Sequence, residues 1–183
     1  GSVTATGGSA GIGGGAYKNA GTIVINDGTV TATSTGNGAG IGGGGGQYAG
    51  DNMGIGGSIT INGGTVTAQG GQYGAGIGGG GADVQAGDKS GAQASGNITI
   101  TGGVVKATGG QYAPGIGSGA LRKISTDLIW VGSGDNRHQV VPTLGENAGK
   151  MGEIVISGGS VNAVNGEDFL APSSTTERAA NSY

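Results

Sequence analysis

One phrase recurs along this chain and constrains its fold more than any other feature. The phrase is Ile-Thr-Ile-Asn-Gly-Gly-Thr-Val-Thr-Ala-Gln-Gly-Gly-Gln-Tyr-Gly-Ala-Gly-Ile-Gly-Gly-Gly, from Ile59 to Gly80. Near-copies begin at Thr22, Asn97 and Glu153, and a remnant opens the chain at Ser2. Repeats of this length are typical of solenoids, in which each coil buries its apolar face against its neighbours.

Each repeat begins with two short segments of alternating apolar residues. The first is Thr22–Ile25 and its copies, in which alternation places the two isoleucines on the inner face. The second is Thr29–Ala32 and its copies, in which a valine and an alanine face inward and threonines face outward. An Asn/Gly-rich corner such as Asn26-Asp27-Gly28 separates them, because a sharp turn needs residues that tolerate positive φ. We therefore expect two strands joined by a tight corner.

A Gly-Ile-Gly stretch forms the third side of the predicted coil. Its isoleucines, at positions 12, 41, 77 and 116, recur in phase with the strands, which favours an ordered side. The alternative is a mobile glycine loop that only the isoleucine anchors, because glycine has little β propensity. Two strands and a glycine-rich side close a coil in about twenty residues, and coils would stack about 4.8 Å apart.

The sequence thus predicts an all-β, single-domain parallel β-helix with insertion loops on one side. A meander of antiparallel hairpins is the alternative, but the constant three-part order fits a coil better. Residues 1–165 are expected to form about five coils, interrupted by a long insertion at 118–152. Residues 166–183 leave the repeat and are expected to form a C-terminal cap or tail.

Composition excludes several classes of protein. The 183 residues include 8 basic and 11 acidic side chains and no cysteine. The chain therefore lacks a basic surface for nucleic acid, and thiol chemistry and disulfides are ruled out. No apolar run is long enough to span a bilayer. With 49 glycines in phase rather than at every third position, and only 3 prolines, a collagen helix is also excluded.

The long insertion holds the predicted ligand-binding residues, because function on a solenoid usually lies where the repeat is broken. It contains the single Trp and the single His of the chain. An aromatic ring beside carboxylates, amides and Arg is a plausible way to hold a sugar. The candidates are Asp127, Trp130, Asp135, Asn136, Arg137 and His138. The structural alternative is that apolar residues such as Leu128 and Ile129 cover an exposed coil edge.

Tyr73 and Tyr112 are two further candidates, because they occupy the same position in neighbouring repeats. A partly exposed tyrosine pair can bind a glycan or a protein. Alternatively, the two rings stack on adjacent coils and cover the glycine backbone.

Signals for other functions are weaker. Gly78–Asp83 matches the beginning of a calcium-binding nonapeptide, but Gln85 replaces its large apolar residue and no tandem copy follows. No other metal or cofactor is predicted, and His138 has no identifiable partner for acid–base catalysis. The outward threonines at 29, 31, 65 and 67 resemble ice-binding rows, but the rows are broken at Val104 and Lys106. A polysaccharide-degrading enzyme and an ice-binding protein therefore remain minority hypotheses.

The phrases Ile-Thr-Ile-Asn-Gly-Gly-Thr-Val-Thr-Ala and Gly-Ala-Gly-Ile-Gly-Gly-Gly resemble the glycine-rich repeats of large secreted or wall-attached bacterial proteins. The resemblance covers residues 1–118 and 153–165. It implies a β-helical stalk or adhesion module, outside the cell, with polysaccharides or cell-surface glycans as partners. No binding residue carries over, because the resemblance lies in scaffold positions.

We therefore expect a noncatalytic extracellular module for adhesion or carbohydrate binding, with the insertion as the recognition surface. A structural spacer within a larger surface protein is the rival hypothesis. The sequence leaves the oligomeric state open.

Overall fold

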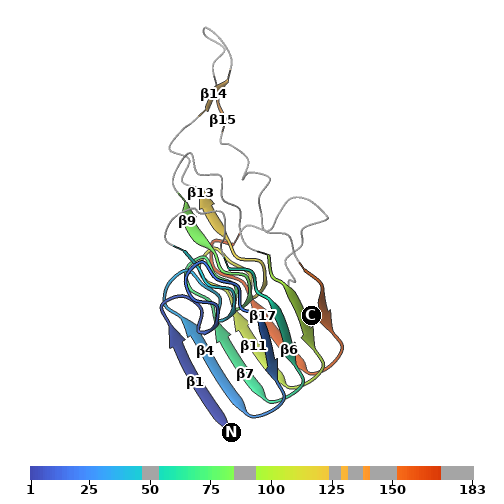
Figure 1. The fold of residues 1–183 in the computed structure, drawn as a ribbon. Coiled ribbons are helices and arrows are strands. Elements are labelled where there is room, and N and C mark those ends of the chain that lie inside the picture. The colour runs from blue at the N-terminus through green and yellow to red at the C-terminus, as the bar shows by residue number, and fades with distance from the viewer. Residues whose placement is uncertain (47–53, 85–93, 124–128, 132–137, 141–151, 170–183) are drawn as a thin grey trace.

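The chain winds into a three-sided parallel β-helix (Figure 1). The structure is a computed structural model that describes residues 1–46, 54–84, 94–123, 129–131, 138–140 and 152–169. Successive strands pass from one sheet to the next, and each sheet pairs strands from successive coils. All pairings in the three coil sheets are parallel, so the antiparallel meander is excluded.

The valine sheet carries the second strand of every repeat. Its five strands, in spatial order, are β1 (Ser2–Gly7), β4 (Thr29–Ser34), β7 (Thr65–Gln69), β11 (Val104–Thr108) and β17 (Ser160–Val164). The register stacks valine on valine and alanine on alanine, as the repeat predicts. Figure 1 shows these strands side by side in the order of their coils.

The isoleucine sheet carries the first strand of every repeat. Its strands are β3 (Thr22–Ile25), β6 (Ser58–Ile61), β10 (Asn97–Ile100) and β16 (Ile154–Ile156). Ile23, Ile59, Ile98 and Ile154 form one ladder, and Ile25, Ile61, Ile100 and Ile156 form the next. The inward placement predicted from alternation is confirmed.

The glycine sheet is the ordered third side. Its two-residue strands are β2 (Ile12–Gly13), β5 (Ile41–Gly42), β8 (Ile77–Gly78) and β12 (Ile116–Gly117). The glycine of each pair has φ between 134° and 146°, a region that side chains with a Cβ rarely adopt. A Cβ on Gly42 would also collide with the carbonyl oxygen of Gly78 on the next coil. The prediction of an ordered side is confirmed, and close coil stacking explains its glycines.

The core is a narrow apolar column enclosed by the three sheets. The inward isoleucines, valines and alanines of the middle coils are almost fully buried: Ile41, Ile59, Ile61, Val66, Ala68, Ile77, Ile98, Ile100, Val105, Ala107 and Ile116. The end coil differs, since Val3 is 51% exposed whereas its ladder neighbour Val30 is 8% exposed. Burial therefore depends on having a coil on both sides.

The corner between the isoleucine and valine sheets carries a ladder of side-chain hydrogen bonds. The Asn62 Nδ2 donates to Asn26 Oδ1 at 2.8 Å, and the Thr101 Oγ1 donates to Asn62 Oδ1 at 3.0 Å. Beside this ladder, Gly28, Gly64, Gly103 and Gly159 all have positive φ, between 85° and 96°. The predicted Asn/Gly turn chemistry is therefore repeated in each coil.

We expect Asn62→Ala to destabilise the protein by about 1 kcal/mol, because two exposed hydrogen bonds are lost and water replaces part of them. Urea unfolding followed by circular dichroism will measure the change. Thr60→Ala on the outer face of the same strand is the control, since no side-chain hydrogen bond depends on it in the described structure. Equal effects of the two substitutions would show that the ladder contributes nothing.

The insertions leave the coil on one side, after the glycine sheet, as predicted. β9 (Ala82–Val84) and β13 (Leu121–Lys123) begin two of them and pair in parallel, and Gly46 bridges to Ala82. In the longest insertion β14 (Ile129–Val131) and β15 (His138–Val140) form an antiparallel hairpin. Figure 1 draws this hairpin beyond β9 and β13, away from the coils.

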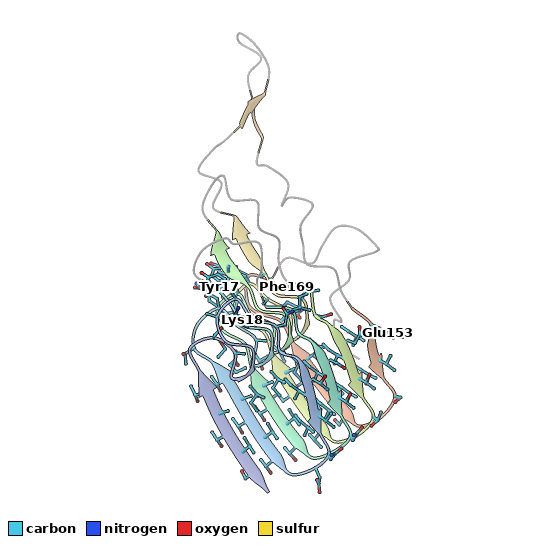
Figure 2. All side chains as sticks on the ribbon, in the orientation of Figure 1. Tyr17, Lys18, Glu153 and Phe169 are labelled. Carbon is cyan, nitrogen blue, oxygen red and sulfur yellow. The ribbon has the colours of Figure 1, made fainter. Side chains whose placement is uncertain are left out.

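The first residues of the predicted C-terminal cap are hydrogen-bonded to the preceding coil. The Gly166 N donates to Ala113 O at 3.0 Å, and the Asp168 N donates to Gln111 O at 2.9 Å. Residues 166–168 therefore still stack on the preceding coil. Phe169, which we expected in the cap, is half-buried at this end of the solenoid (Figure 2).

Candidate functional site

A groove crosses the coils where the strands of the valine sheet end. The groove is open to solvent and has a volume of about 930 Å³. Because all strands of this sheet run parallel, their last residues and the corners that follow lie along one edge. Four successive coils contribute the lining, through residues 34–37, 69–72, 108–111 and 164–167. The groove therefore runs across the strands, along the axis of the solenoid.

Glycine makes the floor of this groove. Gly36, Gly71, Gly110 and Gly166 form one column, in which a Cβ on each residue would collide with the carbonyl oxygen of the glycine one coil earlier. The close stacking excludes any larger residue at these positions, and Gly71 and Gly110 in the middle coils are buried. A glycine two residues after the valine-sheet strand therefore recurs in each of these four coils and keeps the bottom of the groove free of side chains.

Carboxamides make one wall of the groove. Gln72 and Gln111 are exposed and occupy equivalent positions on neighbouring coils, where the Gln72 Nε2 donates to Gln111 Oε1 at 3.3 Å. The Gln111 Nε2 continues the row by donating to Asp168 Oδ2 at 2.6 Å. An amide side chain has two N–H donors and two acceptor lone pairs, so each glutamine keeps hydrogen-bonding capacity beyond these bonds.

The groove carries little charge, and that charge is negative. Among its lining residues Glu167 is the only ionisable side chain, and it is exposed. Asp168 lies next to it in the chain and ends the amide row. Val164 adds an apolar patch and is 41% exposed. The surface is suited to hydroxyl-rich ligands that form many hydrogen bonds without ion pairs.

The candidates predicted in the insertion are only partly placed. Asp127, Asp135, Asn136 and Arg137 lie outside the described residues. Trp130 and His138 belong to the hairpin, where the register pairs Trp130 with Gln139 and His138 with Val131. The two residues are therefore not cross-strand partners. Their role in binding stays a prediction.

The tyrosine pair corrects one prediction. The rings of Tyr73 and Tyr112 stack with centroids 5.1 Å apart and an interplanar angle of 11°. Tyr73 is fully buried and offers no ring face to a ligand, so a partly exposed pair is wrong for this residue. Coils on both sides cover Tyr73, whereas Tyr112 lies closer to the end and is half-buried. The alternative, stacked rings over glycine backbone, accounts for the pair.

Tyr17 shows the same use of an aromatic ring on glycine. A Cβ on Gly46 would meet the Tyr17 ring, so the ring lies directly against that glycine. Tyr17 itself has φ of 61°, which is rare for a residue with a side chain. Tyr17 and Lys18 mark the first insertion in Figure 2.

The structure adds no support to the ice-binding hypothesis or to the calcium-binding hypothesis. The register places Thr4, Thr31 and Thr67 in one row, which Lys106 then interrupts. In the calcium motif, Gly78 and Gly79 take part in coil stacking, with the Gly79 N donating to Gly117 O. Among the described residues, no three His, Asp or Glu side chains gather in a way that could hold a metal.

In the same part of the chain no helix is long and apolar enough to cross a membrane.

Sequence reasoning missed the groove although part of its signal was visible. Gln72 and Gln111 occupy equivalent repeat positions, each directly before a tyrosine. The tyrosines were predicted as candidates because of this repetition, and the glutamines were not. The contribution of Glu167 and Asp168 was less visible, because their segment lies where the repeat pattern has ended.

Comparison with known protein families matches segments of this chain to the model described as a β-helix repeat. The matched residues are 1–16, 23–45, 59–81, 98–120 and 154–173. Together these segments cover more than half of the chain, and 23–45, 59–81 and 98–120 each overlap one strand of every coil sheet. Neither the curated proteins nor the solved structures contain a match.

Proposed function

Because this chain belongs to the β-helix repeat family, whose fold serves as a scaffold in enzymes and non-enzymes alike, we propose that it is a noncatalytic extracellular module that binds polysaccharide. The groove at the ends of the valine-sheet strands is the proposed binding surface. The observation that carries the proposal is the in-phase row of exposed amides, Gln72 and Gln111, beside a column of closely stacked glycines.

Geometry supports a polymeric ligand. Four coils contribute equivalent segments to the groove, and neighbouring coils lie about 4.8 Å apart. This spacing is comparable to the rise of one sugar in an extended polysaccharide. A sugar chain lying along the axis would therefore meet similar donors and acceptors at each unit.

Chemistry supports a noncatalytic role. Glycoside hydrolysis commonly uses two carboxyl groups on opposite sides of the scissile bond. The lining of the groove holds one carboxylate, that of Glu167, and Asp168 beside it accepts the Gln111 hydrogen bond. The groove thus lacks a facing pair of carboxylates among its described lining residues.

We expect the double substitution Gln72→Ala and Gln111→Ala to weaken polysaccharide binding by about 5-fold or more, because each lost hydrogen bond contributes about 0.5–1.5 kcal/mol. A glycan array followed by titration calorimetry on the best ligand will measure the change. Asn62→Ala is the matched control, since it removes an amide from a ladder outside the groove. Unchanged affinity in the double variant would contradict binding at this groove.

The insertion is tested in the same assay. Trp130→Ala and His138→Ala report on the hairpin within the insertion at 118–152, the recognition surface predicted from the sequence. If these variants lose binding and the glutamine variant does not, the recognition surface is the insertion.

A structural spacer is the second candidate. The observation that favours it is that Gln72, Gln111 and Asp168 bond to one another, as a purely structural ladder would. Absence of binding by the intact protein to every polysaccharide on the array would favour the spacer.

A further inference from the structure

We propose that the ligand of the groove is an uncharged polysaccharide that lies parallel to the solenoid axis, with about one sugar per coil. This inference rests on the proposed function and specifies its substrate class. The groove crosses the coils in one direction, and no lining residue is Lys or Arg.

Charge argues against acidic polymers. Polysaccharides built from uronic acids carry a carboxylate on each unit and need cations on the protein or in solution for binding. The lining instead presents the Glu167 carboxylate, with Asp168 adjacent, at the end of the groove formed by the last coil. The exposed Lys106 lies on β11 two residues before the lining residue Thr108 and is not part of the lining. Like charges within a Debye length of about 8 Å repel, so the groove selects against uronic acids.

The repetition of the lining from coil to coil argues against a single sugar as the ligand. The Gly36, Gly71, Gly110 and Gly166 column is continuous from coil to coil, and it provides a track rather than a closed pocket. Each coil adds one polar side chain directly after its column glycine: Asn37, Gln72, Gln111 and Glu167. Affinity is therefore expected to increase with each sugar until all four coil segments are occupied.

The first experiment is a length series. Oligosaccharides of one to six units, prepared from the neutral polymer that binds best, are titrated by calorimetry. We expect affinity to rise by about 2- to 10-fold per unit, as one further net hydrogen bond per coil implies, and to level off at four or five units. A plateau at one or two units would overturn the axial placement while leaving polysaccharide binding intact.

The second experiment isolates charge. Methyl-esterified and de-esterified polygalacturonate share one backbone and differ in carboxylate charge, and neutral glucan, xylan and mannan complete the panel. The intact protein is expected to bind neutral members and to prefer the esterified form. Tighter binding of the free acid would overturn the inference, whereas no binding to any member would overturn the proposed function.

A charge-reversal variant provides the internal control. Glu167→Lys is expected to strengthen binding of the free acid by about 2- to 5-fold, as one exposed ion pair implies, with less effect on neutral chains. Glu153→Lys changes the charge equally, but Glu153 lies beside β16, outside the groove lining (Figure 2). Equal responses of the two variants would mean that overall charge, rather than the groove, controls binding.

Discussion

Gly78→Ala is expected to be among the most destabilising single substitutions in this protein, although it adds one methyl group. Gly78 has φ of 135°, and holding an alanine there costs about 1–3 kcal/mol. The new Cβ would also collide with the carbonyl oxygen of Gly117. That oxygen accepts the hydrogen bond from the Gly79 N at 2.9 Å, so separating the coils weakens this bond as well. Forced overpacking adds about 1–3 kcal/mol.

Substitutions at two other glycines distinguish the cost of backbone strain from the cost of steric collision. Gly21 has φ of 74° but open space around its Cβ position, so Gly21→Ala should show backbone strain of about 1–2 kcal/mol without a collision. Gly15 has neither positive φ nor a close neighbour, so Gly15→Ala should be neutral or stabilise by about 0.4–1 kcal/mol. Urea unfolding monitored by circular dichroism will rank the three variants. If Gly78→Ala is no worse than Gly21→Ala, close stacking of the glycine sheet is wrong.

Ile98→Ala is expected to destabilise the protein by about 2–5 kcal/mol, as for other fully buried isoleucines. Ile98 is 0% exposed, and its ladder places Ile59 on one side and Ile154 on the other. No neighbouring side chain is available to fill the cavity, because each coil contributes only one residue to this isoleucine ladder. The same unfolding measurement, with hydrogen exchange of the neighbouring strands, will show whether the loss spreads to adjacent coils.

Position along the solenoid should set the size of such effects. Ile154→Ala, in the same ladder but half-buried in the last coil, is expected to cost less than Ile98→Ala. Val24→Ala, on the outer face and 54% exposed, should change stability by less than about 0.5 kcal/mol. A different order, with Val24 above Ile98, would mean that the inner and outer faces have been exchanged.

The coil itself was predictable because its information is local and repeated. Alternation in Thr22–Ile25 and Thr29–Ala32 identifies the inner face, and the identical phrases force one register, since a slip by one residue would expose every isoleucine. The in-phase isoleucines at 41 and 77 correctly indicated an ordered glycine side. The position of the insertions on one side followed from the same phase.

The candidate site was less predictable, because it depends on which residues the stacking brings together. Tyr73 and Tyr112 occupy equivalent repeat positions, yet one is buried and the other half-buried because they differ in distance from the end of the solenoid. The unusual composition of the insertion made it the more visible candidate in the sequence. The groove has ordinary composition, and only the alignment of Gln72, Gln111 and Asp168 across coils makes it visible.

Sequence by itself therefore determined the coil, its register and its core. Each repeat places apolar residues at the same inward positions, and these residues are buried only when the coils stack in register. Tertiary structure alone decided the shape of the groove, the burial of Tyr73 and the stacking of residues 166–168 on the preceding coil. These features arise from contacts between residues that are far apart in the chain, such as Gln111 and Asp168. Local patterns specify which face a residue takes, whereas stacking specifies its neighbours.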